Sequence, residues 1–282
     1  MTKIALLGAG GKMGVRLATN LHTSASNGKF TVQHVEISEE GRKRLSDAIG
    51  ATCVDQEQAL AEADVVLMAV PDRLIGKIAH TFIDKIKPGT AIIMLDAAAP
   101  YAGELPKRDD ITYFVTHPCH PPIFNDEIEP EAKNDFFGGI AAKQHIVCAL
   151  MQGPEEHYPL CEEIARTIYK PVMNSHRVTV EQLAILEPAL SETVGATLSL
   201  AMRDAVDEAE RRGVPRAAAV DFMLGHLNIE LAIAFGIFPQ GRFSDGALHA
   251  IEQAKPVIFK EGWLESVFNR DSVLKSVKDI CK

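Results

Sequence analysis

Residues 3–21 read KIALLGAGGKMGVRLATNL, which is a short apolar strand, a glycine turn and the start of an amphipathic helix. Gly8, Gly11 and Gly14 are spaced by three residues, and Gly10 gives an alternative GxG pattern. Glycine allows a tight turn and a close approach of the backbone to a pyrophosphate, whose charge is stabilised by the free N–H groups of the helix N-terminus. The stretch therefore predicts a turn that binds a dinucleotide.

An acidic residue follows this turn at the expected distance. The second predicted strand, FTVQHVEI, ends at Glu36, about 20 residues after the last glycine, where an acid hydrogen-bonds the adenosine ribose. No arginine stands ready for a 2′-phosphate, so the sequence favours NAD over NADP; the alternative is that Glu36 only caps the strand. The residues predicted to bind the cofactor are Gly8, Gly10, Gly11, Lys12, Met13, Gly14, Glu36 and Pro71.

Apolar strands alternate with helical segments through the first half of the chain. Continuous apolar runs, which are typical of parallel strands covered on both faces, occur at residues 63–72, 90–100, 111–118 and 144–152. A further helix and the strand KPVMNSH follow. The alternation predicts an α/β fold with a Rossmann-type, doubly wound parallel sheet over residues 1–177. Ligands of such sheets bind beyond the carboxyl ends of the strands, where Pro71 and His117 stand.

The second half of the chain has a helical period throughout. Residues 178–214 fit one long helix bent at Pro188, and residues 261–281 fit a single later helix. Residues 217–235 are apolar with few charges and are expected to pack against a second subunit; a monomeric bundle is the alternative. We predict an all-α C-terminal domain over residues 178–282 that binds substrate and forms a homodimer.

Composition restricts the partners and the compartment. The net charge of −9 argues against a nucleic-acid or anionic-membrane partner. No apolar run approaches the roughly 20 residues of a membrane span, and the N-terminus has the pattern of a first strand rather than of a targeting segment. The chain has five cysteines, an odd number; they are widely spaced and no CxxC motif occurs. We therefore expect a cytoplasmic protein that acts on a small molecule.

The stretch HPCHPPIFNDE, residues 117–127, places ligand-type side chains in a proline-rich loop after a predicted strand. His117 is expected near the nicotinamide, where it can act as a general base or a metal ligand. Of Cys119 and His120, one can point inward but rarely both; we expect Cys119 to be buried, and the roles of both stay open. Residues 125–127 either bind substrate hydroxyls or cap a following segment.

Two glutamates lie in the apolar sequence ILEPALSETVGATL. Glu187 and Ser191 are four residues apart and share a face of an α-helix, and Glu192 is one position further round. An unpaired buried charge is expensive, so such a carboxylate is paired or functional; the alternative is that both glutamates face solvent. We predict one divalent metal ion held by His117 and Glu187, with His117 and Glu192 as the catalytic residues.

The motifs also indicate a family. The turn GAGGKMG, the strand VVLMAVPD, the THP after a late strand and the long helix resemble the 6-phosphogluconate dehydrogenase-like superfamily. HPCHPPIFNDE together with EPALSE resembles the bacterial D-apionate oxidoisomerases, over the whole chain. The resemblance implies NAD-dependent oxidation of a CH–OH group in a branched sugar acid, D-apionate, coupled to a carbon-skeleton shift that gives 3-oxo-isoapionate.

The sequence departs from two branches of the superfamily. Ser191 stands where ketol-acid reductoisomerases, by resemblance, have a second acid, so one metal ion is expected rather than two. The start of the long helix lacks the catalytic lysine of the 3-hydroxyacid dehydrogenases. Two alternatives to a metal-assisted oxidoisomerase stay open: a simple NAD-dependent hydroxy-acid dehydrogenase with His117 as base and no metal, and a non-catalytic NAD-binding sensor.

Overall fold

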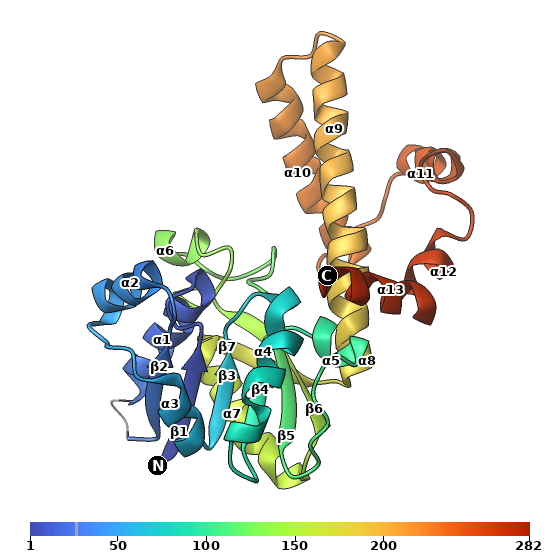
Figure 1. Ribbon diagram of the computed structural model, residues 1–282. Helices are drawn as coiled ribbons and strands as arrows, with labels where there is room; N and C mark the ends of the chain where they lie inside the picture. The colour runs from blue at the N-terminus through green and yellow to red at the C-terminus, as the bar shows by residue number, and fades with distance from the viewer. Residues whose placement is uncertain (26–27) are drawn as a thin grey trace. The chain divides into compact units, whose positions relative to one another are not determined.

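The computed structural model describes residues 1–25 and 28–282, which form two compact units (Figure 1). The first unit comprises Met1–Ala184 and Leu274–Lys282, and the second comprises Ile185–Val273. The predicted division after residue 177 assigned the whole C-terminal part to the helical domain. That division stays a prediction, and the compact units differ from it because residues 178–184 and 274–282 belong to the first unit.

A seven-stranded sheet with the order β2-β1-β3-β4-β5-β6-β7 forms the centre of the first unit. Strands β1 to β5 are parallel, which confirms the predicted α/β fold. The expectation of an entirely parallel sheet is wrong at one place, because β6 pairs antiparallel to β5. The chain returns from β5 through residues 119–143 along the same edge, whereas a parallel strand would need a crossover. The strands are Thr2–Leu7, Phe30–Val35, Val65–Met68, Ala91–Met94, Thr112–Pro118, Gln144–Gln152 and Val172–Arg177.

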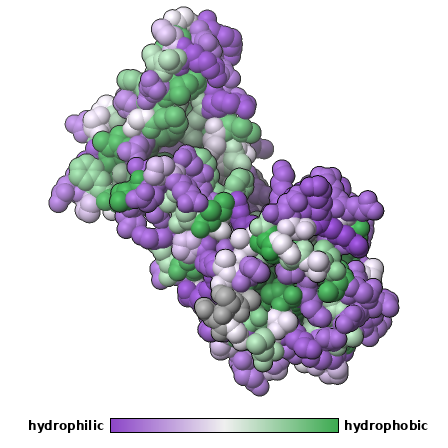
Figure 2. All heavy atoms as spheres, turned by 90° about the vertical axis from the view of Figure 1, so that its left-hand side faces the viewer, coloured by the Kyte–Doolittle hydropathy of each residue, from purple (hydrophilic) through white to green (hydrophobic). Residues whose placement is uncertain are grey.

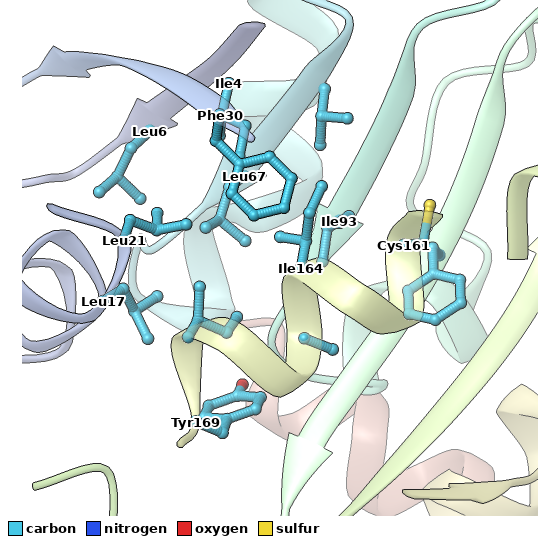
Figure 3. Close-up of a cluster of buried hydrophobic side chains, with 14 of the residues drawn as sticks. Ile4, Leu6, Leu17, Leu21, Phe30, Leu67, Ile93, Cys161, Ile164 and Tyr169 are labelled. Carbon is cyan, nitrogen blue, oxygen red and sulfur yellow. The ribbon is translucent and has the colours of Figure 1, made fainter. Parts of the chain in front are cut away.

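The helices of the first unit cover both faces of this sheet. Helices α1 and α7 pack on one face, where Leu17, Leu21 and Ile164 meet Ile4, Phe30 and Leu67 of the strands in a buried hydrophobic cluster (Figure 3). The crossovers β2–β3 and β3–β4 place α3 and α4 on the other face. The helices are α1 (Lys12–Ala25), α2 (Glu39–Ile49), α3 (Gln56–Glu62), α4 (Ile75–Phe82), α5 (Ala98–Ala102), α6 (Pro130–Lys133), α7 (Tyr158–Ile168) and α8 (Val180–Ala184), with short 3-10 helices at Asp72–Leu74, Ile83–Lys85 and Glu155–His157.

The second unit is helical, but the long predicted helix is not a regular α-helix. Its elements are a π-helix (Ile185–Ala196), α9 (Thr197–Arg211), α10 (Arg216–Ala234), α11 (Asp245–Ile258) and α12 (Trp263–Phe268). The last helix, α13 (Arg270–Ile280), begins in the second unit and ends in the first. Pro188 lies inside the π-helix and has no N–H for an α-helical bond, so a wider turn is a physical alternative there. Thr193 Oγ1 donates to Pro188 O at 2.6 Å, which spans the same wider turn.

The single helix expected over residues 261–281 is divided into α12 and α13. Asn269 separates them in an extended conformation, and its side-chain oxygen accepts a hydrogen bond from Ser272 N at 3.0 Å. This is an N-cap, which begins a new helix rather than continuing the old one.

The expectation that no apolar run is long enough to span a membrane is wrong for helix α10. By length and composition alone it could cross a membrane. An apolar helix that packs inside a protein passes the same test. Its large apolar side chains are exposed on the single chain, Phe222 by 68% and Leu224 by 63%.

The glycine turn between β1 and α1 is packed closely against backbone atoms at three of its glycines. A Cβ on Gly14 would lie 2.0 Å from Gly8 O, and one on Gly10 would lie 2.3 Å from the backbone of Gly41 in α2. Gly8 has φ +75, and a Cβ there would lie 2.4 Å from Ala69 O at the end of β3. A Cβ on Gly11 meets nothing nearer than 3.3 Å. The turn therefore requires glycine at three positions for steric reasons.

Gly14→Ala is expected to lower the free energy of unfolding by about 3 kcal/mol, because the new Cβ forces α1 away from the turn. Gly11→Ala is the matched control and is expected to cost less than about 1 kcal/mol. Denaturant unfolding of both variants measures the difference. Equal destabilisation by the two substitutions would contradict the packing described for Gly14.

Candidate functional site

The glycine turn is fixed to the end of β2 by backbone and side-chain hydrogen bonds. Gly8 N and Ala9 N both donate to Val35 O, at 3.0 and 3.1 Å. Gly10 N donates to Glu36 Oε2 at 3.0 Å, and Ser38 N donates to Glu36 Oε1 at 2.9 Å. The Glu36 carboxylate thus joins the turn to the start of α2. A carboxylate has about four acceptor positions, so two further donors such as ribose hydroxyls fit the same group.

An arginine lies closer to Glu36 than the sequence suggested. Arg42 Nε donates to the backbone oxygen of Glu36 at 2.7 Å. The sequence places Arg42 six positions after Glu36, and the first turn of α2 brings the two together. The guanidinium is held on backbone, while the negative charge at this strand end belongs to the Glu36 side chain.

The remaining residues predicted for the cofactor lie along the same edge. Helix α1 begins at Lys12, so the amides of Lys12 and Met13 are in its first turn, where backbone N–H groups have no acceptor within the helix. Lys12 is exposed and Met13 is half-buried. Pro71 follows β3, the strand next to β1. This is the point where the strand order reverses, which is the usual dinucleotide site of the fold.

His117 is held at the carboxyl end of β5. Its Nδ1 lies 2.8 Å from Leu95 O. A carbonyl only accepts hydrogen bonds, so Nδ1 carries the proton and the lone pair of the neutral ring is on Nε2. Burial lowers the pKa of His117, while the bond to Leu95 and the charge of Asp96 oppose that shift. The neutral imidazole can therefore take a proton or bind a cation through Nε2.

Two groups at this edge were missed by the sequence reasoning. Asp96 is buried, and its carboxylate accepts a hydrogen bond from Ala98 N at 2.5 Å. The sequence signal for Asp96 was an acid directly after the apolar run 91–95. The second group is Cys281, which also belongs to the first unit. Burial is the main cause that raises the pKa of its thiol, and the charges of Glu104, Asp96 and Asp72 add to the shift. No local pattern places the end of a chain beside residue 96.

The loop after β5 resolves some of the open alternatives. The expectation that Cys119 is buried is wrong, because this residue is exposed; its backbone N donates to His145 O. His120 is the one that turns inward, with its ring 6.1 Å from that of His117, centroid to centroid. Asn125 Oδ1 accepts from Glu127 N, and Glu127 Oε1 accepts from Lys143 N. These bonds are those of a capped turn.

The glutamates predicted for metal binding and proton transfer belong to the second unit. Glu187 and Glu192 lie in the π-helix, whose wider turn puts both Ser191 and Glu192 within about one residue of the face of Glu187. Glu187 is half-buried and Glu192 is exposed. Among the described residues, no three His, Cys, Asp or Glu side chains come together as a metal site. The ligand pair of His117 and Glu187 stays a prediction.

The first unit thus places the Nε2 of His117 on the edge that carries a nucleotide-type turn. The turn and Glu36 lie at the ends of β1 and β2, and His117 lies at the end of β5. A base at this edge can take the proton of a substrate hydroxyl while a dinucleotide bound along the same edge takes the hydride. The arrangement fits oxidation of an alcohol.

Comparison with known proteins agrees with this geometry. Residues 125–281 match the family described as phosphogluconate dehydrogenase (decarboxylating) C-term, and residues 3–99 match NADP oxidoreductase coenzyme F420-dependent. The D-apionate oxidoisomerases of Cupriavidus necator and Rhizobium rhizogenes are each 56% identical to the chain, over 99% of it and over 99% and 100% of their own lengths. A Cupriavidus necator protein called a semialdehyde dehydrogenase NAD-binding protein, crystallised with calcium and NAD, has a TM-score of 0.96 at 55% identity over 99% of each chain. The resemblance inferred from the motifs is confirmed, and the chain belongs to the D-apionate oxidoisomerase family of the 6-phosphogluconate dehydrogenase-like superfamily.

Proposed function

We propose that the protein is a cytoplasmic, NAD-dependent oxidoisomerase that converts D-apionate to 3-oxo-isoapionate. The observation that carries the proposal is the hydrogen bond from His117 Nδ1 to Leu95 O, which assigns the lone pair to Nε2 at the cofactor edge. Relatives that are 56% identical over the full length carry the same activity in their names. The glycine cradle and the Glu36 carboxylate suit a dinucleotide, whose nicotinamide supplies a hydride acceptor when bound.

The overall reaction divides into an oxidation and a migration. In the oxidation the C2 carbon of the acid loses a hydride, and His117 takes the proton of the C2 hydroxyl. In the migration one hydroxymethyl group moves with its bonding electrons from C3 to C2. The C3 hydroxyl loses its proton and becomes the ketone, while the former C2 carbonyl oxygen gains one. The second step needs proton transfer but no further oxidant. Glu192 is proposed to carry one of these protons.

A divalent metal ion is the second part of the proposal. His117 also fits a metal ligand, because ligating histidines commonly bind a backbone carbonyl through the other ring nitrogen, as His117 does. Nε2 has a single lone pair, so where it holds the ion the proton of the C2 hydroxyl would pass to another group, for which Glu192 is proposed. The ion would polarise the hydroxyl and carbonyl oxygens of the acid. Glu187 is proposed as its second ligand on sequence grounds. The similar Cupriavidus necator protein was crystallised with calcium.

NAD is proposed rather than NADP. The Glu36 carboxylate, held by Gly10 N and Ser38 N, would face a 2′-phosphate with the same sign of charge. Arg42 is the observation that favours NADP, since its guanidinium is hydrogen-bonded to the Glu36 backbone and carries a positive charge. A carboxylate beside the ribose favours the free hydroxyl, which donates a hydrogen bond to it.

A homodimer formed through the second unit is also proposed. Helix α10 exposes Phe222, Leu224 and Ile229 by 68%, 63% and 48%. Figure 2 shows hydrophobic surface among hydrophilic residues on the part of the molecule that holds α9 and α10. Exposed apolar surface of this kind is usually covered by another protein surface.

The function is tested by following NADH absorbance with purified protein, D-apionate and NAD. We expect NADH formation that EDTA abolishes and a divalent ion restores, a slower reaction with NADP, and 3-oxo-isoapionate as the product. Activity that resists EDTA, on simple hydroxy acids only, would select the plain dehydrogenase. Binding of NAD without any turnover would select the sensor.

His117→Gln is expected to lower kcat for D-apionate by about a factor of 10² to 10⁴, since the lone pair at Nε2 is lost. The dissociation constant for NAD should stay within about twofold, because His117 takes no part in the glycine turn. The matched control is His249→Gln on exposed α11, which should behave as wild type. Loss of NAD affinity along with activity would show that His117 is structural.

Phe222→Glu is expected to convert a dimer into a monomer in sedimentation experiments, because a charge would be buried at the interface. The same substitution at Ile128, an exposed apolar residue of the first unit, is the control and should leave a dimer. A monomeric wild-type protein would rule out the homodimer.

A further inference from the structure

His120 has a backbone conformation that its side chain disfavours. Its φ is +62, and among the described residues it is the non-glycine residue with a positive φ. Holding a non-glycine residue in this region costs about 1 kcal/mol or more, and such strain gathers at functional sites. Glycine would relieve the strain, yet the chain has histidine here, three positions after His117.

The ring of His120 is bound to a backbone carbonyl in the same way as that of His117. Its Nδ1 lies 2.9 Å from Phe137 O, a carbonyl that can only accept, so Nδ1 carries the proton. In the neutral ring the lone pair is then on Nε2. The rings of His120 and His117 meet edge to face, at 89°. Two neighbouring imidazoles thus each bind a backbone carbonyl through Nδ1 and keep Nε2 as an acceptor.

The segment that carries this carbonyl is contacted by α1, the helix of the glycine turn. Asp135 Oδ2 accepts hydrogen bonds from Ile140 N, Ala141 N and Ala142 N, which closes the segment that contains Phe137. Asn20 Nδ2 of α1 donates to Gly139 O at 2.9 Å, and the Arg16 guanidinium, also on α1, lies 5.8 Å from the centre of the Phe137 ring. His120 is therefore positioned relative to the cofactor helix and to His117 together.

We propose that His120 is a substrate-binding residue whose Nε2 accepts a hydrogen bond from a hydroxyl adjacent to the one held at His117. The two imidazoles then take acids with neighbouring hydroxyl groups and discriminate against acids with one. This inference rests on the proposed function and names the feature of the substrate that the site selects. A site built to bind a hydroxyl loses affinity for analogues without it, because its own polar group is left unpaired.

The test measures binding rather than turnover, by calorimetric titration of acids into the enzyme–NADH complex. His120→Phe keeps an aromatic ring against His117 and removes both nitrogens. We expect it to weaken D-apionate binding about tenfold, the effect of one lost hydrogen bond, and to leave the weaker binding of lactate, which has one hydroxyl, unchanged. His249→Phe on exposed α11 is the control. Unchanged D-apionate binding by His120→Phe would overturn the proposal.

The variant His120→Gly distinguishes a role of His120 in substrate binding from a role in supporting the loop. Glycine adopts φ +62 without strain, so this variant should melt within about 3 °C of wild type and bind NADH normally, yet bind D-apionate as weakly as His120→Phe. A large fall in melting temperature or in NADH affinity would show that His120 only supports the loop. Failure of the proposed function is measured separately: wild-type enzyme would form no NADH from D-apionate. If the wild-type enzyme also failed to bind D-apionate, the His120 proposal would be overturned as well.

Discussion

The hydrogen bond between His117 Nδ1 and Leu95 O is the interaction on which the site depends. It joins the ends of β4 and β5, which are paired in parallel with Met94 opposite Val115, and the buried strands keep that register. A one-residue slip would turn His117 to the other face of the sheet. The bond selects the tautomer, and burial lowers the pKa of the ring, so a neutral imidazole with an accepting Nε2 is the stable state. The sheet thus determines the position and the chemical state of the reactive group.

The cofactor half of the site is also held together by contacts with backbone atoms. Glu36 accepts from Gly10 N and Ser38 N, and the glycines of the turn touch backbone where a Cβ would not fit. Helix α1, which starts at this turn, also holds the segment around Phe137 through Asn20 and Arg16. Because that segment orients His120, the turn, the helix and the loop form one connected support in the first unit. Displacement of α1 would disturb nucleotide binding and the proposed hydroxyl recognition together.

The glycine turn and the strands were predictable because their signals are local. Buried runs such as residues 144–152 coincide with β6, and the spacing from Gly14 to Glu36 follows from one strand–helix–strand unit. The direction of β6 was not predictable, since it depends on the path of residues 119–143. Pro188 indicated an irregular helix, but the sequence did not predict that the irregularity is a π-helix. The exposure of Cys119 and the approach of Cys281 to Asp96 arise from tertiary packing, for which the sequence has no short-range pattern.

The central claim is that His117 is neutral, with its proton on Nδ1 and its lone pair on Nε2. Nitrogen NMR of ¹⁵N-histidine-labelled protein at neutral pH, with His117→Gln used to assign the signals, measures this directly. The account predicts a protonated Nδ1 and an unprotonated Nε2 in the metal-free enzyme, and a shift of the Nε2 signal when substrate or a divalent ion is added. A proton on Nε2, or a ring that is doubly protonated at neutral pH, would contradict it.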